Sequence, residues 1–291
     1  MRLGAVFPQS EIGTDPAVIR DYAQTVEGMG YTHLIIYDHV ILAEARPGEQ
    51  SYYTAEKQMH EPFVLYGFLA AVTRTLELAT GILILPQRQT VLVAKQAAEV
   101  DVLSGGRMRL GVAAGWNPVE FQALNEDFHT RGRRLDEQIA LLRALWRDPV
   151  VTFHGRWHQI ENAGINPLPV RHDIPIWVGG HSDAALRRTA RLGNGWLPQR
   201  KPDERAAEDV RLLHQYTREA GRPEDSVAIE GRLTISQAPD EGEWAPFAAG
   251  WQALGATYFT VSTMGLNLPD VAAHIELLRR MKAALGPLGE P

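Results

Sequence analysis

The chain has 291 residues and a formal net charge of −6, with its charged residues interspersed along the sequence. This balance offers no basic surface for nucleic acid or for an anionic membrane, so we expect neither as a partner. Because there is no cysteine, the composition excludes disulfides, a thiolate nucleophile and a cysteine metal site. No signal-peptide pattern precedes the first apolar run, and no run approaches the length of a membrane span, so we expect a soluble cytoplasmic protein.

Short apolar runs alternate with amphipathic segments along the chain. The clearest unit is the apolar run at 76–85, the helical pattern at 91–103 and the strand from 107, which together predict a βαβ unit with parallel strands. The predicted strands are 2–7, 32–37, 76–85, 107–116, 174–180, 195–197, 227–235 and 258–261. The predicted helices are 16–28, 61–74, 91–103, a short one from 117, 131–146, 182–192, 203–220, 244–254 and 270–285.

Eight strands, each followed by a helix or a helix-containing segment, favour a (β/α)8 TIM barrel over an open doubly wound sheet. There is no linker or internal repeat, so we expect one domain over residues 1–291. Residues 148–173, rich in Pro, Gly and His, form an insertion before the fifth strand and are predicted to contain a hairpin. The polar stretch 40–60 is long for a connection, and such loops usually form a lid or part of a binding site.

Asp38 and His39 end the second predicted strand, at the face where (β/α)8 barrels bind ligands. An imidazole beside a carboxylate can carry a proton near neutral pH, so His39 is our candidate general acid or base. Neighbouring strand residues point to opposite faces, so a direct hydrogen bond between the two does not follow. In the alternative, Asp38 caps the following turn and His39 only lines the pocket. The strand-end residues Phe7, Gln9 and Trp196 are candidates for the substrate pocket.

Gly179 and Gly180 join the fifth strand to a helix that begins at Ser182 or Asp183. Glycines allow close approach of the backbone to a ligand, and a helix N-terminus favours phosphate. The alternative is a plain turn with Ser182 or Asp183 as the helix cap. Both interpretations remain open from the sequence.

Small residues at 111–115 end the fourth strand. Their spacing does not match a dinucleotide-binding fingerprint, and they would let a flat ring system lie against the backbone or would simply pack tightly inside the barrel. Trp116, Trp177 and Trp196 could form an aromatic wall or belong to the core. No spacing of metal ligands stands out, and no GxSxG elbow of a serine hydrolase is present.

Several segments of the first 200 residues, taken together, resemble the luciferase-like monooxygenase superfamily, in particular its branch of oxidoreductases that use the deazaflavin coenzyme F420. The most specific are Leu-Ser-Gly-Gly-Arg at 103–107 and Trp-Val-Gly-Gly at 177–180, supported by Asp38-His39 and by the small-residue segment 111–116. The resemblance implies a (β/α)8 barrel with an insertion before the fifth strand. It also implies a bulge near Thr80-Gly81-Ile82, often with a non-prolyl cis peptide, that backs the ring of the cofactor.

By this resemblance, Asp38 and His39 line the deazaflavin ring, and Gly179-Gly180 form the turn that binds phosphate. The expected cofactor-binding residues are Asp38, His39, Thr80, Gly81, Ile82, Gly115, Trp116, Val178, Gly179, Gly180 and His181.

The sequence therefore predicts an enzyme that transfers hydride between reduced F420 and a small organic substrate held under the 40–60 loop. Two alternatives remain: a monooxygenase of the same fold that uses reduced FMN and oxygen, and a cofactor-binding protein without efficient catalysis. Because relatives in this superfamily are often dimers, we expect a homodimer.

Overall fold

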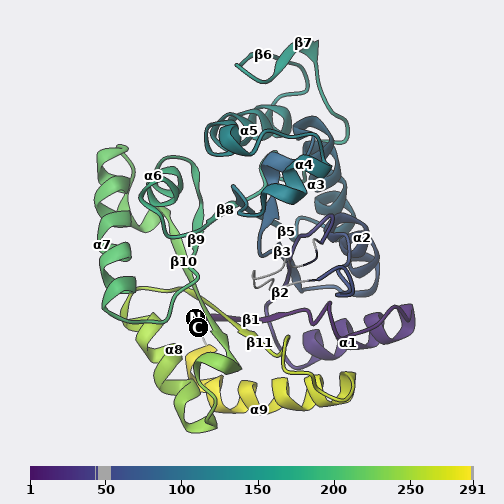
Figure 1. Ribbon diagram of the computed structural model, residues 1–291, viewed down its shortest axis with the longest axis vertical. Coiled ribbons are helices and arrows are strands. Elements are labelled where there is room, and N and C mark those ends of the chain that lie inside the picture. Colours follow the sequence, from purple (N-terminus) through teal and green to yellow (C-terminus); the bar gives the residue numbers. More distant parts are fainter. Residues whose placement is uncertain (43, 45–53, 290–291) are drawn as a thin grey trace.

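The computed structural model describes residues 1–42, 44 and 54–289, and its centre is a closed barrel of parallel strands surrounded by helices (Figure 1). Eight strand positions form the barrel, one of them shared by the short strands β3 and β4. The barrel strands are β1 (Arg2–Val6), β2 (His33–Ile36), β3 (Glu77–Thr80), β4 (Leu83–Ile84), β5 (Met108–Ala113), β8 (Ile176–Gly179), β9 (Gly195–Leu197), β10 (Ala228–Thr234) and β11 (Tyr258–Ser262).

The barrel closes because β3 pairs with β5 as well as with β2, with Leu78 opposite Met108. From β5 the ring continues through β8, β9, β10 and β11 to β1, and all of these pairings are parallel. The predicted (β/α)8 barrel is thus confirmed.

The predicted strand over 76–85 is interrupted at Gly81-Ile82, between β3 and β4. The backbone of Gly81 lies against β2, so that a Cβ there would be 2.1 Å from Cγ2 of Ile35. The interruption lies where the resemblance placed a bulge. Among the described residues the cis peptide bond is Asn166–Pro167, and none lies at residues 80–82.

The helices begin where the sequence provides caps. Asp15 accepts a hydrogen bond from the amide of Ala17 (2.8 Å) ahead of Pro16, and Glu61 does the same for Val64 (2.8 Å). The helices are α1 (Pro16–Gly28), α2 (Pro62–Val72), α3 (Thr90–Ser104), α4 (Pro118–Ala123), α5 (Arg131–Arg147), α6 (Asp183–Leu192), α7 (Glu204–Glu219), α8 (Trp244–Ala253) and α9 (Val271–Gly289). In the ranges that the structure describes, none of them is long and apolar enough to cross a bilayer.

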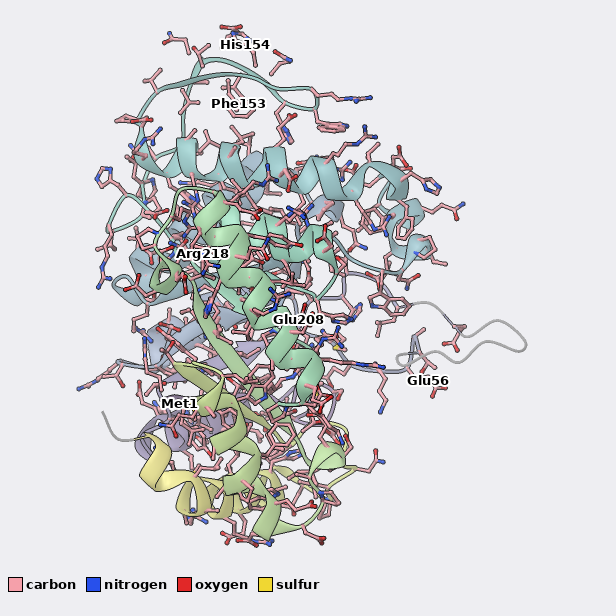
Figure 2. All side chains as sticks on the ribbon, turned by 90° about the vertical axis from the view of Figure 1, so that its left-hand side faces the viewer. Met1, Glu56, Phe153, His154, Glu208 and Arg218 are labelled. Atoms are coloured by element: carbon pink, nitrogen blue, oxygen red, sulfur yellow. The ribbon has the colours of Figure 1, made fainter. Side chains whose placement is uncertain are left out.

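The segment 148–173 carries an antiparallel hairpin of β6 (Val151–His154) and β7 (Gln159–Ala163), as predicted. It projects beyond α5 at one end of the molecule, where Phe153 and His154 lie at the edge (Figures 1 and 2). The hairpin therefore stands outside the ring of barrel strands.

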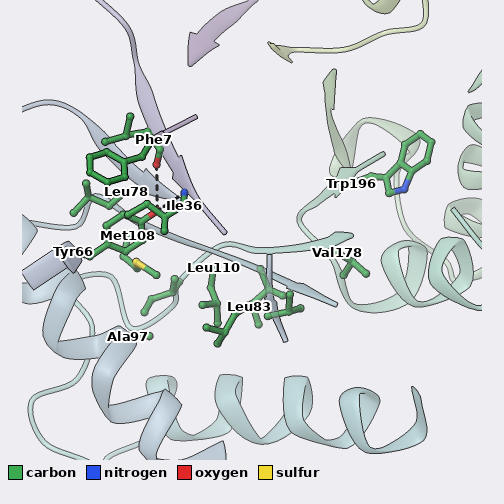
Figure 3. Close-up of a cluster of buried hydrophobic side chains, with 14 of the residues drawn as sticks. Phe7, Ile36, Tyr66, Leu78, Leu83, Ala97, Met108, Leu110, Val178 and Trp196 are labelled. Atoms are coloured by element: carbon green, nitrogen blue, oxygen red, sulfur yellow. Dashed lines mark hydrogen bonds between the residues drawn. The ribbon is translucent and has the colours of Figure 1, made fainter. Parts of the chain in front are cut away.

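The main hydrophobic core fills the space between the strands and the helices. Alternation along β1 sends Leu3 and Ala5 outward into this core, whereas Val6 points into the barrel, where it packs with Ile35 and Ala79. Figure 3 shows part of the outer core, with Tyr66 of α2 hydrogen-bonded to the backbone of Ile36 (3.2 Å). The inner cluster is small, so other groups must fill the rest of the barrel.

Charged residues fill the amino-terminal half of the barrel interior. Arg109 of β5 is fully buried, forms an ion pair with Glu230 of β10, and lies 2.7 Å from Oε1 of Glu77 on β3. His33 of β2 contacts Oε1 of Glu230 at 2.9 Å, and the guanidinium of Arg109 lies over the ring of Trp177, 4.3 Å from its centre. These groups link strands from both sides of the barrel.

Within this network, the pKa of Glu230 shows which effect dominates. Burial by itself raises the pKa of the Glu230 carboxyl, but the charges of Arg109 and His33 and their hydrogen bonds outweigh burial and hold the pKa well below its ordinary value. The pair is therefore ionised at neutral pH. The network leaves no room for a side chain at position 4, because a Cβ on Gly4 would lie 2.1 Å from Nε2 of His33.

We expect Glu230→Gln to lower the free energy of unfolding by about 3–5 kcal/mol, because it leaves the charge of Arg109 buried with weaker compensation. Urea unfolding followed by circular dichroism measures this change. The control is Glu208→Gln on α7, an exposed partner of Arg211 visible in Figure 2, which should leave the midpoint unchanged. Equal midpoints for both variants would contradict a stabilising role for the buried pair.

Candidate functional site

A cavity of about 940 Å³ opens at the carboxyl ends of the barrel strands. This is the face on which (β/α)8 barrels bind ligands, and the size lies within the range of about 300–1,000 Å³ typical of small-molecule sites. Most of the predicted ligand-binding residues line it, namely Asp38, His39, Gly81, Ile82, Gly115, Trp116, Gly179, Gly180 and His181.

The other predicted site residues are buried and do not line this cavity: Phe7, Gln9, Thr80, Val178 and Trp196. Because Val6 faces the barrel interior, Phe7 points outward, where its ring packs 5.4 Å from that of Tyr22. Val178 and Trp196 belong to the same outer core and are drawn in Figure 3.

Three of these buried side chains support the backbone of the site. Trp196 donates a hydrogen bond from Nε1 to the carbonyl of Gly180 (2.7 Å), and Thr80 donates one to the carbonyl of Gly111 (2.7 Å). Gln9 donates from Nε2 to the carbonyl of Tyr37 (3.1 Å). Their contribution is to hold the strand ends in place.

One side of the cavity is a wall of small residues. It is formed by residues at three strand ends: Gly81 and Ile82 between β3 and β4, Ala113 to Gly115 at the end of β5, and Gly179 at the end of β8. These ends pack closely, since a Cβ on Gly179 would lie 2.8 Å from Cγ2 of Ile82. Ile82 and Ile84 are the larger apolar side chains among these small residues, and the flat face of a ring system can lie against this wall.

The turn after β8 caps α6 and also lines the cavity. Ser182 is the cap of α6 and accepts a hydrogen bond from the amide of Ala185 (3.3 Å), as the simpler interpretation predicted. Gly180 has a φ of +109°, a conformation that favours glycine, and residues 179–182 line the cavity. The N-terminus of α6 thus reaches the ligand space, where its unpaired amides favour an anion.

Asp38 is held away from His39. Its Oδ1 accepts a hydrogen bond from Nη2 of Arg88 (2.8 Å), and its Oδ2 accepts one from the amide of Ile84 (2.9 Å). Arg88 also bonds Glu61 (2.9 Å). Burial by itself lowers the pKa of Arg88, but the two carboxylates outweigh it and raise that pKa. Asp38 therefore ties the end of β2 to β4 next to the small-residue wall.

His39 pairs with Glu120 of α4. Nδ1 of His39 lies 2.8 Å from Oε1 of Glu120, whose side chain is 1% exposed. Glu120 also accepts hydrogen bonds from Gln87 (3.1 Å) and Asn117 (3.2 Å). A carboxylate acceptor assigns the proton of His39 to Nδ1 and fixes the orientation of the ring.

Sequence reasoning missed Glu120, Arg88 and Arg232, which also lines the cavity. Glu120 had a weak signal, because Asn117 followed three residues later by a glutamate is the pattern of a capping box. That pattern predicts the start of a helix, but it carries no information about the contact with His39, 81 residues away. In the part of the chain that the structure covers, no three His, Asp or Glu side chains gather as metal ligands.

Comparisons with known proteins identify the family and agree with the barrel fold. A family model described as luciferase-like monooxygenase matches residues 2–281. A Mycobacterium tuberculosis protein, Rv0940c, is 35% identical over 66% of this chain and 68% of its own length. Pyrimidine monooxygenase RutA of Allorhizobium ampelinum is 28% identical over 74% of this chain and 63% of its own length.

Among solved structures, an F420-dependent secondary alcohol dehydrogenase in complex with an F420-acetone adduct has a TM-score of 0.80. The alignment covers 98% of both chains at 16% sequence identity. At that identity the likeness establishes the fold.

We expect Glu120→Ala to lower the free energy of unfolding by about 1–3 kcal/mol, because it leaves the buried donors of His39, Gln87 and Asn117 without their acceptor. It should also release the ring of His39, which a crystal structure of the variant or its imidazole nitrogen NMR signals would show. Glu276→Ala on α9, an exposed glutamate, is the control and should change neither. An unmoved His39 ring in Glu120→Ala would contradict the role of this carboxylate.

Proposed function

The chain belongs to the luciferase-like monooxygenase family, and on that premise we propose that it is an F420-dependent oxidoreductase acting on a small organic substrate. One observation carries the most weight. The small-residue wall and the Gly179-Gly180 turn line the same cavity of about 940 Å³, so that a flat ring and an anionic group can be held together.

The residues present fit such a cofactor. Gly81, Ile82 and residues 113–115 would hold the ring, and residues 179–182 at the start of α6 would hold the phosphate. When bound, reduced F420 supplies a hydride. The protein orients the substrate against the ring, excludes water, and moves a proton at His39, whose ring Glu120 orients.

The charge of the cavity supports F420, which carries carboxylates in addition to its phosphate. Arg131 lines the cavity beside Gly115, and its guanidinium donates hydrogen bonds to the carbonyls of Gly115 (3.1 Å) and Phe128 (2.8 Å). His181 and Lys57 are exposed at the same cavity. An anionic tail leaving the Gly179-Gly180 turn would meet these cationic and polar groups.

FMN remains the second candidate. It is favoured by the similarity to pyrimidine monooxygenase RutA, a sequence relative, and the wall and the phosphate turn would suit its ring and phosphate equally. The chain spans 63% of that relative's length. We place F420 first because Arg131 and Lys57 at the cavity would suit its additional carboxylates.

We also infer a homodimer formed through α2 and α3, which pack side by side. Val64 and Phe68 lie one turn apart on α2, and their exposed fractions are 74% and 37%. On α3, Leu92 and Leu103 are 50% and 56% exposed and lie 11 residues apart, on the same face. An apolar face of this kind marks an interaction surface.

Titration of the protein with F420 and with FMN, followed by absorbance and fluorescence, should show tighter binding of F420.

With F420 bound, His39→Ala should lower turnover across a panel of carbonyl and alkene acceptors by about 100-fold or more while changing the dissociation constant of F420 less than fivefold. Tighter binding of FMN would move the assignment to the monooxygenase. Unchanged turnover in His39→Ala would remove the proton role, and F420 binding without any turnover would leave a cofactor-binding protein.

Light scattering after size-exclusion chromatography should give twice the chain mass for the wild type. The double variant Val64→Glu/Leu103→Glu should elute as a folded monomer, because each glutamate would be buried against a partner chain. The control Val150→Glu changes a valine that is 57% exposed between α5 and β6 and should stay dimeric. A dimeric double variant would place the interface elsewhere.

A further inference from the structure

Arg232 projects into the cavity from β10. Glu230, Arg232 and Thr234 alternate along this strand, and all three line the cavity, so they form its inward-facing row. Of the three, Glu230 is nearest to the amino-terminal end of the barrel, where it contacts Arg109 and His33. The guanidinium of Arg232 therefore belongs to the layer above the buried charge network, and the side chain is half-buried.

Among the described residues, no carboxylate balances the charge of Arg232. Of the acidic residues that line the cavity, Asp38 pairs with Arg88 and Glu230 pairs with Arg109. Within the described part of the chain, the hydrogen bond of Arg232 is the one from Nη1 to the hydroxyl of Tyr37 (2.9 Å). A guanidinium has five N–H donors, so most of them remain to be used.

Arg188 shows by contrast what a structural arginine of this cavity does. Its Nε bonds Asp136, and its Nη2 donates to the carbonyl of Gly132 (2.8 Å). Arg188 is thus neutralised by a carboxylate of α5. Partly removing a cation from water without such a partner costs free energy, and a bound anion would offset that cost.

The bond between Arg232 and Tyr37 crosses the barrel. Tyr37 follows β2, and β2 and β10 are separated in the ring by β1 and β11. The small-residue wall belongs to the opposite arc, made by β3, β4, β5 and β8. Arg232 therefore faces the side of the cavity away from this wall, and Tyr37 lies between the two, since a Cβ on Gly81 would lie 3.4 Å from Cε1 of the Tyr37 ring.

We propose that Arg232 and Tyr37 form an anion-binding subsite that holds the carboxylate of the substrate, so that the substrates are small organic acids. This specificity rests on the proposed function, because it assigns the wall to the cofactor. The guanidinium can bind a carboxylate through two parallel N–H donors, while the Tyr37 hydroxyl accepts from Arg232 and keeps its own proton to donate. A single guanidinium matches one negative charge, which favours a carboxylate over a phosphate.

The experiment measures binding of benzoate and of its neutral analogue benzamide by calorimetry, to the protein with and without saturating F420. We expect the wild type to bind benzoate at least tenfold more tightly than benzamide. Arg232→Gln should weaken benzoate about 10- to 100-fold and leave benzamide unchanged, and Arg232→Lys, which keeps the charge but loses the paired donors, should fall between. Arg218→Gln on α7, an exposed arginine labelled in Figure 2, is the matched control and should bind like the wild type.

Equal binding of benzoate and benzamide by the wild type would overturn the subsite. So would a loss of both ligands in Arg232→Gln, since this would reveal a structural role, or tighter binding of inorganic phosphate than of benzoate through Arg232. The experiment distinguishes the subsite from the proposed function. Arg232-dependent benzoate binding in a protein that binds neither F420 nor FMN would support the subsite and refute the proposed function.

Discussion

The ion pair between Arg109 and Glu230 is the constraint on which the barrel depends. It places two full charges inside the ring of strands, where they must be compensated by each other, by His33 and by Glu77. The network occupies the amino-terminal half of the interior and forms its floor. The remaining carboxyl half, above a small cluster of Val6, Ile35 and Ala79, is left for a ligand.

Two arcs of the barrel divide the ligand space by chemistry. The arc of β3, β4, β5 and β8 presents mainly glycine and alanine together with Ile82 and Ile84, because a Cβ at Gly81, Gly115 or Gly179 would meet neighbouring side chains. The arc of β10, β11, β1 and β2 presents Arg232 and Tyr37. A cavity with a wall of small residues on one arc and Arg232 on the other has room for two ligands of different kind, as a cofactor-dependent transfer reaction requires.

The adjacent residues Asp38 and His39 have different roles because their side chains contact different parts of the chain. They point to opposite sides, so Asp38 reaches Arg88 and the amide of Ile84, whereas His39 reaches Glu120. The first set of bonds holds the strand interruption beside the wall. The second orients the imidazole, so one dipeptide serves both the shape and the chemistry of the site.

The sequence by itself determined the order and type of the elements, the closed barrel and the face that carries the site. These follow from local patterns, such as apolar runs of strand length, caps like Asp15-Pro16 and the glycines at strand ends. The patterns recur along the chain, so the eight strands and their helices can be counted from the sequence. The tertiary structure alone decided which side chains meet. Phe7 turned to the core because Val6 occupies the interior, and Glu120 met His39 across 81 positions. Arg232 likewise met Tyr37 across the barrel. Such partners are set by strand alternation and ring closure, which bring distant segments together, and no local pattern in the chain records them.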